Sequence, residues 1–127
     1  MKLRLVPLVG VLAMAGCSKI HEQRTFTVDS FSGHSLSITA PVSEQKVKVA
    51  LTSDQPVNVW VLLEKEAPQG DKSRFDPETL KSGVLAKEKN TKEATLTATI
   101  PAKEPYLIFV TNPTQKDANV TVKVDSQ

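Results

Sequence analysis

The feature that most constrains the fold of this chain is a two-residue alternation of apolar and polar side chains. It recurs from residue 26 to residue 124 and is typical of strands with one face on a core and the other in water. A further short strand is predicted from Val84 to Lys87. The alternation predicts seven strands, whose apolar positions are Phe26 and Val28; Leu36, Ile38 and Ala40; Val47, Val49 and Leu51; Val57, Val59, Val61 and Leu63; Ala94, Leu96, Ala98 and Ile100; Tyr106, Ile108 and Val110; Val120, Val122 and Val124.

Turn-forming residues separate these segments, at Ser32-Gly33, Ala40-Pro41, Asp54-Gln55-Pro56, Pro101 to Pro105 and Asn112-Pro113. We therefore expect an all-β fold, an antiparallel β-sandwich of about seven to eight strands. The long connection over residues 67–83 carries one helical turn. Its signal is Asp76-Pro77-Glu78, a capping carboxylate before a proline suited to a first turn, and Gly83 can end it.

The N-terminal residues follow a different pattern. Lys2 and Arg4 precede an uncharged apolar run from Leu5 to Met14, and the small residues Ala15 and Gly16 follow it. This is the layout of a secretory signal peptide, and the run is too short to span a bilayer as a helix.

The stretch from Leu12 to Cys17 resembles the lipobox of bacterial lipoproteins, with Met14 in place of the more frequent leucine. The resemblance implies cleavage between Gly16 and Cys17 and a diacylglyceryl group on the sulfur of Cys17. Two or more acyl chains hold a protein stably on a membrane. In Gram-negative relatives an Asp after the cysteine favours retention in the inner membrane, so Ser18 at this position suggests the outer membrane, facing the periplasm. We therefore expect a lipid-anchored protein of the bacterial cell envelope.

The predicted organisation is a signal peptide over residues 1–16, a lipidated N-terminus and tether over 17–24, and one β-sandwich domain over 25–127. Removal of the leader leaves 14 basic residues against 14 acidic ones. A near-neutral domain without clustered positive charge is not a nucleic-acid binder. Cys17 is the sole cysteine, so the core alone must stabilise the domain, without an intramolecular disulfide.

Four segments of the globular part also follow a family pattern: 56–63, 94–101, 106–113 and 118–124. A threonine-rich strand leads through a proline turn into a Tyr-Leu-hydrophobic strand that ends at Asn. The pattern resembles small bacterial and archaeal β-sandwich modules, jelly-roll-like and similar to GOLD-type domains. The resemblance implies an interaction or accessory domain, and it brings no catalytic residues.

The residues that could carry catalysis or bind a metal do not form a recognisable motif. His21 and His34 lack further ligands at metal-binding spacing. Asp71, Asp76 and Glu78 share the long connection but match no calcium loop. The neighbouring carboxylates Glu64 and Glu66, at a strand exit, are expected to be solvated. We therefore predict neither an enzyme nor a metal or cofactor site.

Two strands are apolar on both faces, which predicts that both faces are covered. Trp60 and Leu62 lie on the face opposite the apolar positions 57, 59, 61 and 63 of their strand. Leu107 and Phe109 lie in the same way opposite Tyr106, Ile108 and Val110. The favoured interpretation is that residues 67–83, with Phe75 and Leu80, fold over this second face. The alternative is a docking surface in which Trp60, Leu62, Leu107 and Phe109 contact a partner or ligand.

The expected function is a membrane-anchored lipoprotein that acts as a non-catalytic interaction or accessory module of the envelope. Its partners would be the membrane, through the lipid on Cys17, and an envelope protein or glycan. The alternative is a carbohydrate- or peptidoglycan-binding lipoprotein, in which Trp60 or Tyr106 stacks on a sugar ring. An envelope hydrolase with an unrecognised site is a third, less favoured class.

Overall fold

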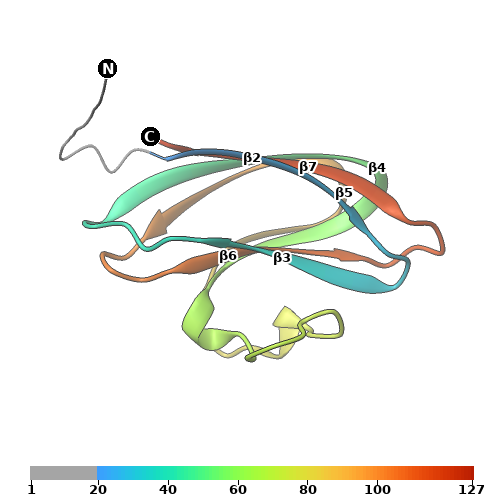
Figure 1. Cartoon of the computed structure of the whole chain (residues 1–127), viewed down its shortest axis with the longest axis horizontal. Helices are drawn as coiled ribbons and strands as arrows, with labels where there is room; N and C mark the ends of the chain where they lie inside the picture. Colours follow the sequence, from blue (N-terminus) through green and yellow to red (C-terminus); the bar gives the residue numbers. More distant parts are fainter. Residues whose placement is uncertain (1–19) are drawn as a thin grey trace, which may run out of the picture.

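The computed structural model describes residues 20–127, so the predicted signal peptide, the lipobox and Cys17 lie outside the described residues. Six antiparallel strands make up this part of the chain, which confirms the all-β prediction (Figure 1). Its helices are too short to cross a membrane. The elements are β2 (His21–Val28), β3 (Ser32–Ile38), β4 (Gln45–Leu63), the 3-10 turns η2 (Glu64–Glu66) and η3 (Pro77–Thr79), β5 (Val84–Ile100), β6 (Tyr106–Asn112) and β7 (Ala118–Ser126).

The strands form one sheet that is folded over into two packed layers. The first layer contains β2, β7, residues 45–53 of β4 and residues 93–100 of β5. The second contains β3, β6, residues 57–63 of β4 and residues 84–91 of β5. The long strands β4 and β5 pass through both layers, and the connection between them (residues 64–83) lies on the outer side of the second layer (Figure 1).

The predicted strand number was wrong because two pairs of predicted strands are each one bent strand. Residues 47–51 and 57–63 are the halves of β4, and residues 84–87 and 94–100 are the ends of β5. The turn signal at 54–56 produces a bulge, seen as a register shift between Thr52 and Val57. A bulge is a place where a strand tolerates proline, since the residue there needs no ladder donor.

The chain passes from one layer to the other at four places, which lie along one line that we call the crease. These places are residues 29–31, 54–56, 90–92 and 113–117. The backbone ladder is interrupted there, and side chains replace it. The buried Asn112 donates from Nδ2 to the carbonyl oxygens of Val28 and Lys116, at 3.0 and 2.6 Å. Asp117 Oδ1 accepts from the backbone nitrogen of Ser30 at 3.0 Å. These bonds join the β6–β7 bend to the β2–β3 turn.

The remaining bends are joined in the same manner. The Asp54 carboxylate accepts from the backbone nitrogen and from Nδ2 of Asn119, at 2.8 and 3.0 Å, and these bonds lower the pKa of Asp54. Asn58 Oδ1 accepts from the backbone nitrogen of Asn90 at 2.8 Å. Neighbouring bends are therefore held together across the whole width of the sheet.

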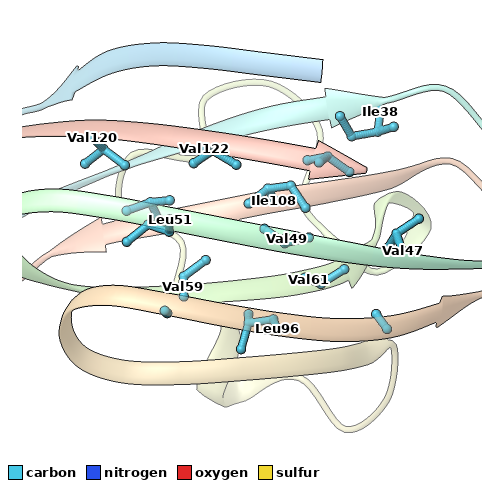
Figure 2. Packing of buried hydrophobic residues seen from close by; sticks show 14 of the residues in the cluster. Ile38, Val47, Val49, Leu51, Val59, Val61, Leu96, Ile108, Val120 and Val122 are labelled. Carbon is cyan, nitrogen blue, oxygen red and sulfur yellow. The ribbon is translucent and has the colours of Figure 1, made fainter. Parts of the chain in front are cut away.

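The core lies between the layers and is built from the alternating positions that the sequence pattern indicates (Figure 2). Val47, Val49 and Leu51 of the first layer face Val59, Val61 and Ile108 of the second, and each is at most 1% exposed. Tyr106 belongs to this core and is fully buried, so it cannot stack on a sugar as the alternative function supposed. Within residues 20–127 its hydroxyl has no hydrogen-bond partner, and burial, reinforced by the Glu22 charge, raises its pKa to about 12.

The sandwich begins earlier than residue 25, the predicted domain boundary. Residues 21–24, expected to belong to a tether, pair with residues 122–125 as the first half of β2. His21 Nδ1 lies 2.5 Å from Asp125 Oδ1. β2 pairs only with β7, and an edge strand held by backbone bonds needs no apolar alternation, which is why the sequence pattern missed it.

Candidate functional site

The outer face of the second layer carries a second apolar cluster, which we call the outer cluster. Trp60 and Leu62 of β4 and Leu107 and Phe109 of β6 form it and are 2, 0, 1 and 0% exposed. The connection covers them with apolar side chains that include Ala67, Phe75 and Leu80. The favoured interpretation of the two-sided strands is therefore confirmed. The four residues lie together as expected, but they do not form an exposed docking surface.

The connection packs on the sheet through contacts between aromatic rings, and a glycine in β3 leaves space for one of these rings. The Phe109 ring lies 5.5 Å from that of Phe75 and 6.2 Å from that of Trp60, centroid to centroid, both tilted. A Cβ at Gly33 of β3 would lie 2.7 Å from Cζ of Phe109, so the absent side chain makes room for this ring. The predicted helical turn is also confirmed, because Asp76 Oδ1 caps η3 by accepting from the backbone nitrogen of Glu78 at 3.0 Å.

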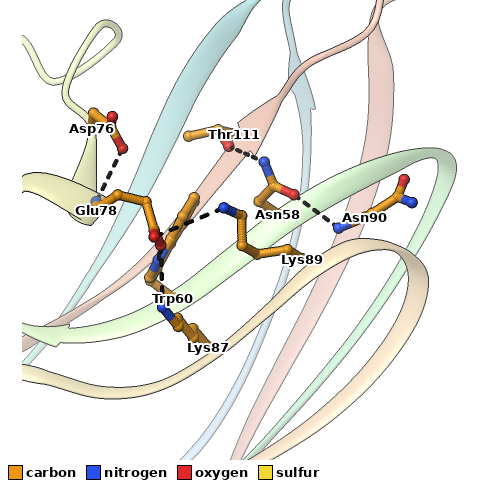
Figure 3. A network of polar contacts seen from close by, with 8 residues as sticks. All are labelled: Asn58, Trp60, Asp76, Glu78, Lys87, Lys89, Asn90 and Thr111. Atoms are coloured by element: carbon orange, nitrogen blue, oxygen red, sulfur yellow. Dashed lines mark hydrogen bonds and ion pairs between the residues drawn. The ribbon is translucent and has the colours of Figure 1, made fainter.

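A polar network joins the connection to β4 and β5 (Figure 3). Glu78 Oε2 accepts from Trp60 Nε1 and from Lys87 Nζ, each at 3.3 Å, and Glu78 Oε1 lies 3.9 Å from Lys89 Nζ. The Lys87 bond, followed by the Trp60 bond, holds the pKa of Glu78 below its ordinary value of 4.5. Glu78 is therefore an exposed carboxylate that ties the connection to Trp60 and Lys87, a contact that we call the Glu78 clip.

A cleft of about 370 Å³ opens where the connection meets the crease end of the second layer. Aromatic side chains from three separate segments line it: Phe31 from the β2–β3 turn, Trp60 from β4 and Phe75 from the connection. Its polar lining includes Asn58, Arg74, Asp76, Glu78, Lys89 and Thr111. The cleft therefore brings aromatic side chains together with hydrogen-bond donors and acceptors.

Phe31 is the aromatic lining residue that the sequence analysis missed, together with the polar residues Asn58, Arg74, Lys89 and Thr111. It is 67% exposed and adopts φ 54°, in the left-handed region. The turn it belongs to is closed by the Ser32 backbone nitrogen donating to the Asp29 carbonyl at 3.1 Å. A side chain in this region costs about 1–2 kcal/mol, and glycine would avoid the cost. The only sequence signal was a phenylalanine next to a predicted turn.

The other residues considered from the sequence do not converge on a site. His34 stacks on Phe26, with ring centroids 4.3 Å apart, where the edge strands β2 and β3 approach each other, and burial lowers its pKa. Asp71 Oδ1 accepts from the Ser73 backbone nitrogen, and Glu66 accepts from Ser82 Oγ. Within residues 20–127 no three His, Cys, Asp or Glu side chains are grouped closely enough to hold a metal ion.

No family model and no curated protein sequence matches this chain. Solved structures of similar fold include the mitogen derived from Yersinia pseudotuberculosis (TM-score 0.59, 9% identity, covering 85% of this chain and 86% of that one). PliG of Aeromonas hydrophila, a periplasmic inhibitor of g-type lysozyme, matches with TM-score 0.53 and 15% identity, over 88% and 89% of the chains.

The pre-peptidase C-terminal domain of collagenase from Bacillus anthracis matches with TM-score 0.52 and 10% identity, over 83% of this chain and 89% of that one. At these identities the likeness shows the fold alone. The chain spans most of each of these three structures, so residues 20–127 form a β-sandwich domain of a type present in bacterial proteins.

Proposed function

We propose that this chain is a lipid-anchored, non-catalytic binding module of the bacterial cell envelope, and that it recognises a protein partner through the crease end. The observation that carries the proposal is Phe31. A large apolar side chain is 67% exposed at the rim of a cleft, on a backbone conformation that disfavours it. Unfavourable backbone geometry concentrates at functional sites, and aromatic side chains dominate the energetics of protein interfaces.

The contacts of the ionisable residues favour binding over catalysis. His21 pairs with Asp125 and His34 stacks on Phe26. Asp76 caps a 3-10 turn and Glu78 clips the connection. These groups make contacts within the fold, and Asp76 and Glu78 also contribute to the mixed polar and aromatic lining of the cleft. A sandwich of the same type, PliG of Aeromonas hydrophila, is a periplasmic inhibitor of a lysozyme, which supports a protein-binding role in the envelope.

The anchor is part of the same proposal. Acylation of Cys17, with cleavage after Gly16, places the domain at the membrane, in the outer membrane facing the periplasm if the host is Gram-negative. Confinement to a surface raises the effective concentration of the module near envelope partners. Mass spectrometry of the native protein tests this step: we expect an N-terminal Cys17 that carries acyl chains. An unmodified sulfur, or a chain that begins upstream of it, would overturn the anchor.

Binding is tested with the lipid-free domain, residues 18–127, as bait in an envelope extract from the producing bacterium. The matched variants are Phe31→Gly and Val42→Ala, which change the two large apolar side chains exposed within the described residues. Phe31→Gly removes an exposed side chain from a backbone conformation that glycine adopts readily, so we expect the variant to stay folded. We expect a specific protein that is captured by the wild type and by Val42→Ala but lost with Phe31→Gly. Equal capture by all three proteins would contradict the proposed site.

A glycan ligand is the second candidate, favoured by the combination of ring surface with Asn58, Asp76 and Thr111 in one cleft. Trp60 cannot stack on a sugar ring, since it is 2% exposed beneath the connection, so Phe31 and Phe75 would have to do so. A glycan array with the same domain separates the candidates. Glycan binding that is lost with Phe31→Gly, together with no captured protein, would favour the glycan.

A further inference from the structure

The chain enters the sandwich at the end opposite the crease. β2 starts at His21, and Val28 is the last residue before the crease, so its eight residues span the first layer (Figure 1). At about 3.3 Å per residue, the entry point and the crease are about 26 Å apart. We call the opposite end of the sandwich the entry end. It contains residue 20, the β3–β4 loop (residues 39–44) and the β5–β6 loop (residues 101–105).

Little chain separates the entry end from the predicted lipid. Four residue steps join Cys17 to His21, and a fully extended chain covers at most about 14 Å over that length. This is shorter than the sandwich is long. The entry end therefore lies close to the membrane surface if Cys17 carries the lipid. The crease could lie closer to that surface only if the long axis of the domain were inverted.

The exposed apolar side chains agree with this arrangement. The large apolar residues that are exposed within the described part of the chain are Phe31 at the crease and Val42 in the β3–β4 loop. Val42 is 74% exposed, and its loop is tied to the β5–β6 loop by the Lys103 backbone nitrogen donating to the Pro41 carbonyl at 2.8 Å. The Val42 loop also contains the acidic Glu44, and the neighbouring loop contains the basic Lys103, so the contact would not require anionic lipid.

We infer that the entry end rests on the phospholipid surface, with Val42 against the lipid, and that the crease and its cleft face away from the membrane. The inference rests on the proposed anchoring of Cys17. It makes the β3–β4 and β5–β6 loops a membrane-contact surface, and it presents Phe31 about 26 Å further out, where a partner approaching from the periplasm can reach it.

The test uses the full lipidated protein in phosphatidylcholine nanodiscs. One additional cysteine, at Val42, Phe31 or Thr97, carries a bimane label, while acylated Cys17 does not react with the reagent. Thr97 is exposed on the outer face of the first layer and reports a domain that lies on its side. Spin-labelled lipids quench bimane only at close range. We expect quenching at Val42→Cys at least threefold stronger than at Phe31→Cys or Thr97→Cys.

The outcomes separate the inference from the function on which it rests. Quenching at position 31 or 97 that equals or exceeds that at position 42 overturns the inference, as does the absence of quenching at all three. Mass spectrometry of the same samples reports acylation of Cys17 independently. If Cys17 is acylated and the quenching pattern is reversed, the orientation is wrong and the anchor stands. If Cys17 is unmodified, the proposed function itself fails.

Discussion

The inner core and the outer cluster lie on opposite faces of the same second layer, yet they are built differently. The inner core draws side chains from all six strands, and both of its walls are layers of the folded sheet. The outer cluster has one sheet wall, made by β4 and β6, and its other wall is the connection. One apolar region is therefore specified by a pattern repeated along the whole chain, and the other depends on a few side chains in an irregular segment.

We therefore expect the inner core to determine the stability of the domain, whereas the proposed binding cleft lies beside the less stable outer cluster. A segment that is held by a small apolar cluster and by exposed ion pairs opens at a lower free-energy cost than a layer of a sandwich. The cleft lies at the edge of that segment, so the part of the molecule proposed to bind is also the part most easily rearranged. The predictions below test whether the two regions respond independently, from the largest expected effect to the smallest.

The largest effect is expected in the inner core. Ile108 is fully buried between the layers, so Ile108→Ala should lower the free energy of unfolding by about 3 kcal/mol, through lost transfer energy and a cavity. Urea denaturation followed by circular dichroism measures the change. Thr97→Ala, on the exposed face of β5, is the control and should cost less than 1 kcal/mol. Similar costs at the two positions would remove the distinction between the faces.

Phe75→Ala should act on the outer cluster alone. Phe75 is half-buried on the connection, and its removal is expected to cost about 1–2 kcal/mol because the connection moves away while the sandwich persists. Trp60 is the sole tryptophan, so iodide quenching of its fluorescence reports the uncovering directly. We expect stronger quenching with an unchanged strand signal in circular dichroism. Loss of both signals together would mean that the two regions unfold as one unit.

Tyr106→Phe removes the hydroxyl that lacks a hydrogen-bond partner within residues 20–127, at the edge of the inner core. Burying an unsatisfied polar group costs free energy, so the substitution should raise the free energy of unfolding by about 1 kcal/mol. The raised pKa of about 12 gives a second readout. Because the unfolded state ionises first, the wild type should lose stability above about pH 10, and the variant should lose less. A destabilised Tyr106→Phe would show that the hydroxyl has a partner.

The smallest effect is expected at the Glu78 clip. Its pKa lies below 4.5 in the folded chain, so its contribution to holding the connection is complete above that pH and is lost as the pH falls through the lowered value. Iodide quenching of Trp60 should therefore increase below pH 4.5 in the wild type. Glu78→Gln should show the increased quenching already at pH 7. Circular dichroism over the same pH range excludes general acid unfolding. Equal iodide quenching in the wild type and Glu78→Gln at every pH would contradict the role of Glu78 in holding the connection.

The sequence predicted the fold class, the covered second face and the capped turn at Asp76, because each depends on local chemistry. It did not predict that β4 continues through residues 54–56, since proline and polar residues mark a bulge and a turn equally well. The start of β2 was missed because backbone pairing with β7 leaves no side-chain pattern. The cleft was beyond reach, because its aromatic residues Phe31, Trp60 and Phe75 meet only after the sheet has folded over.

The position of β2 also has a mechanical consequence. If the chain is held at residue 20 and a partner pulls at the β2–β3 turn, the load runs lengthwise along β2. The bonds of an antiparallel ladder stand perpendicular to the strands, so such a load shears the pairing with β7, eight residue pairs in register, and does not peel it apart one pair at a time. An edge strand that pairs with one neighbour would therefore resist force between the membrane and a bound partner through all of its residue pairs at once.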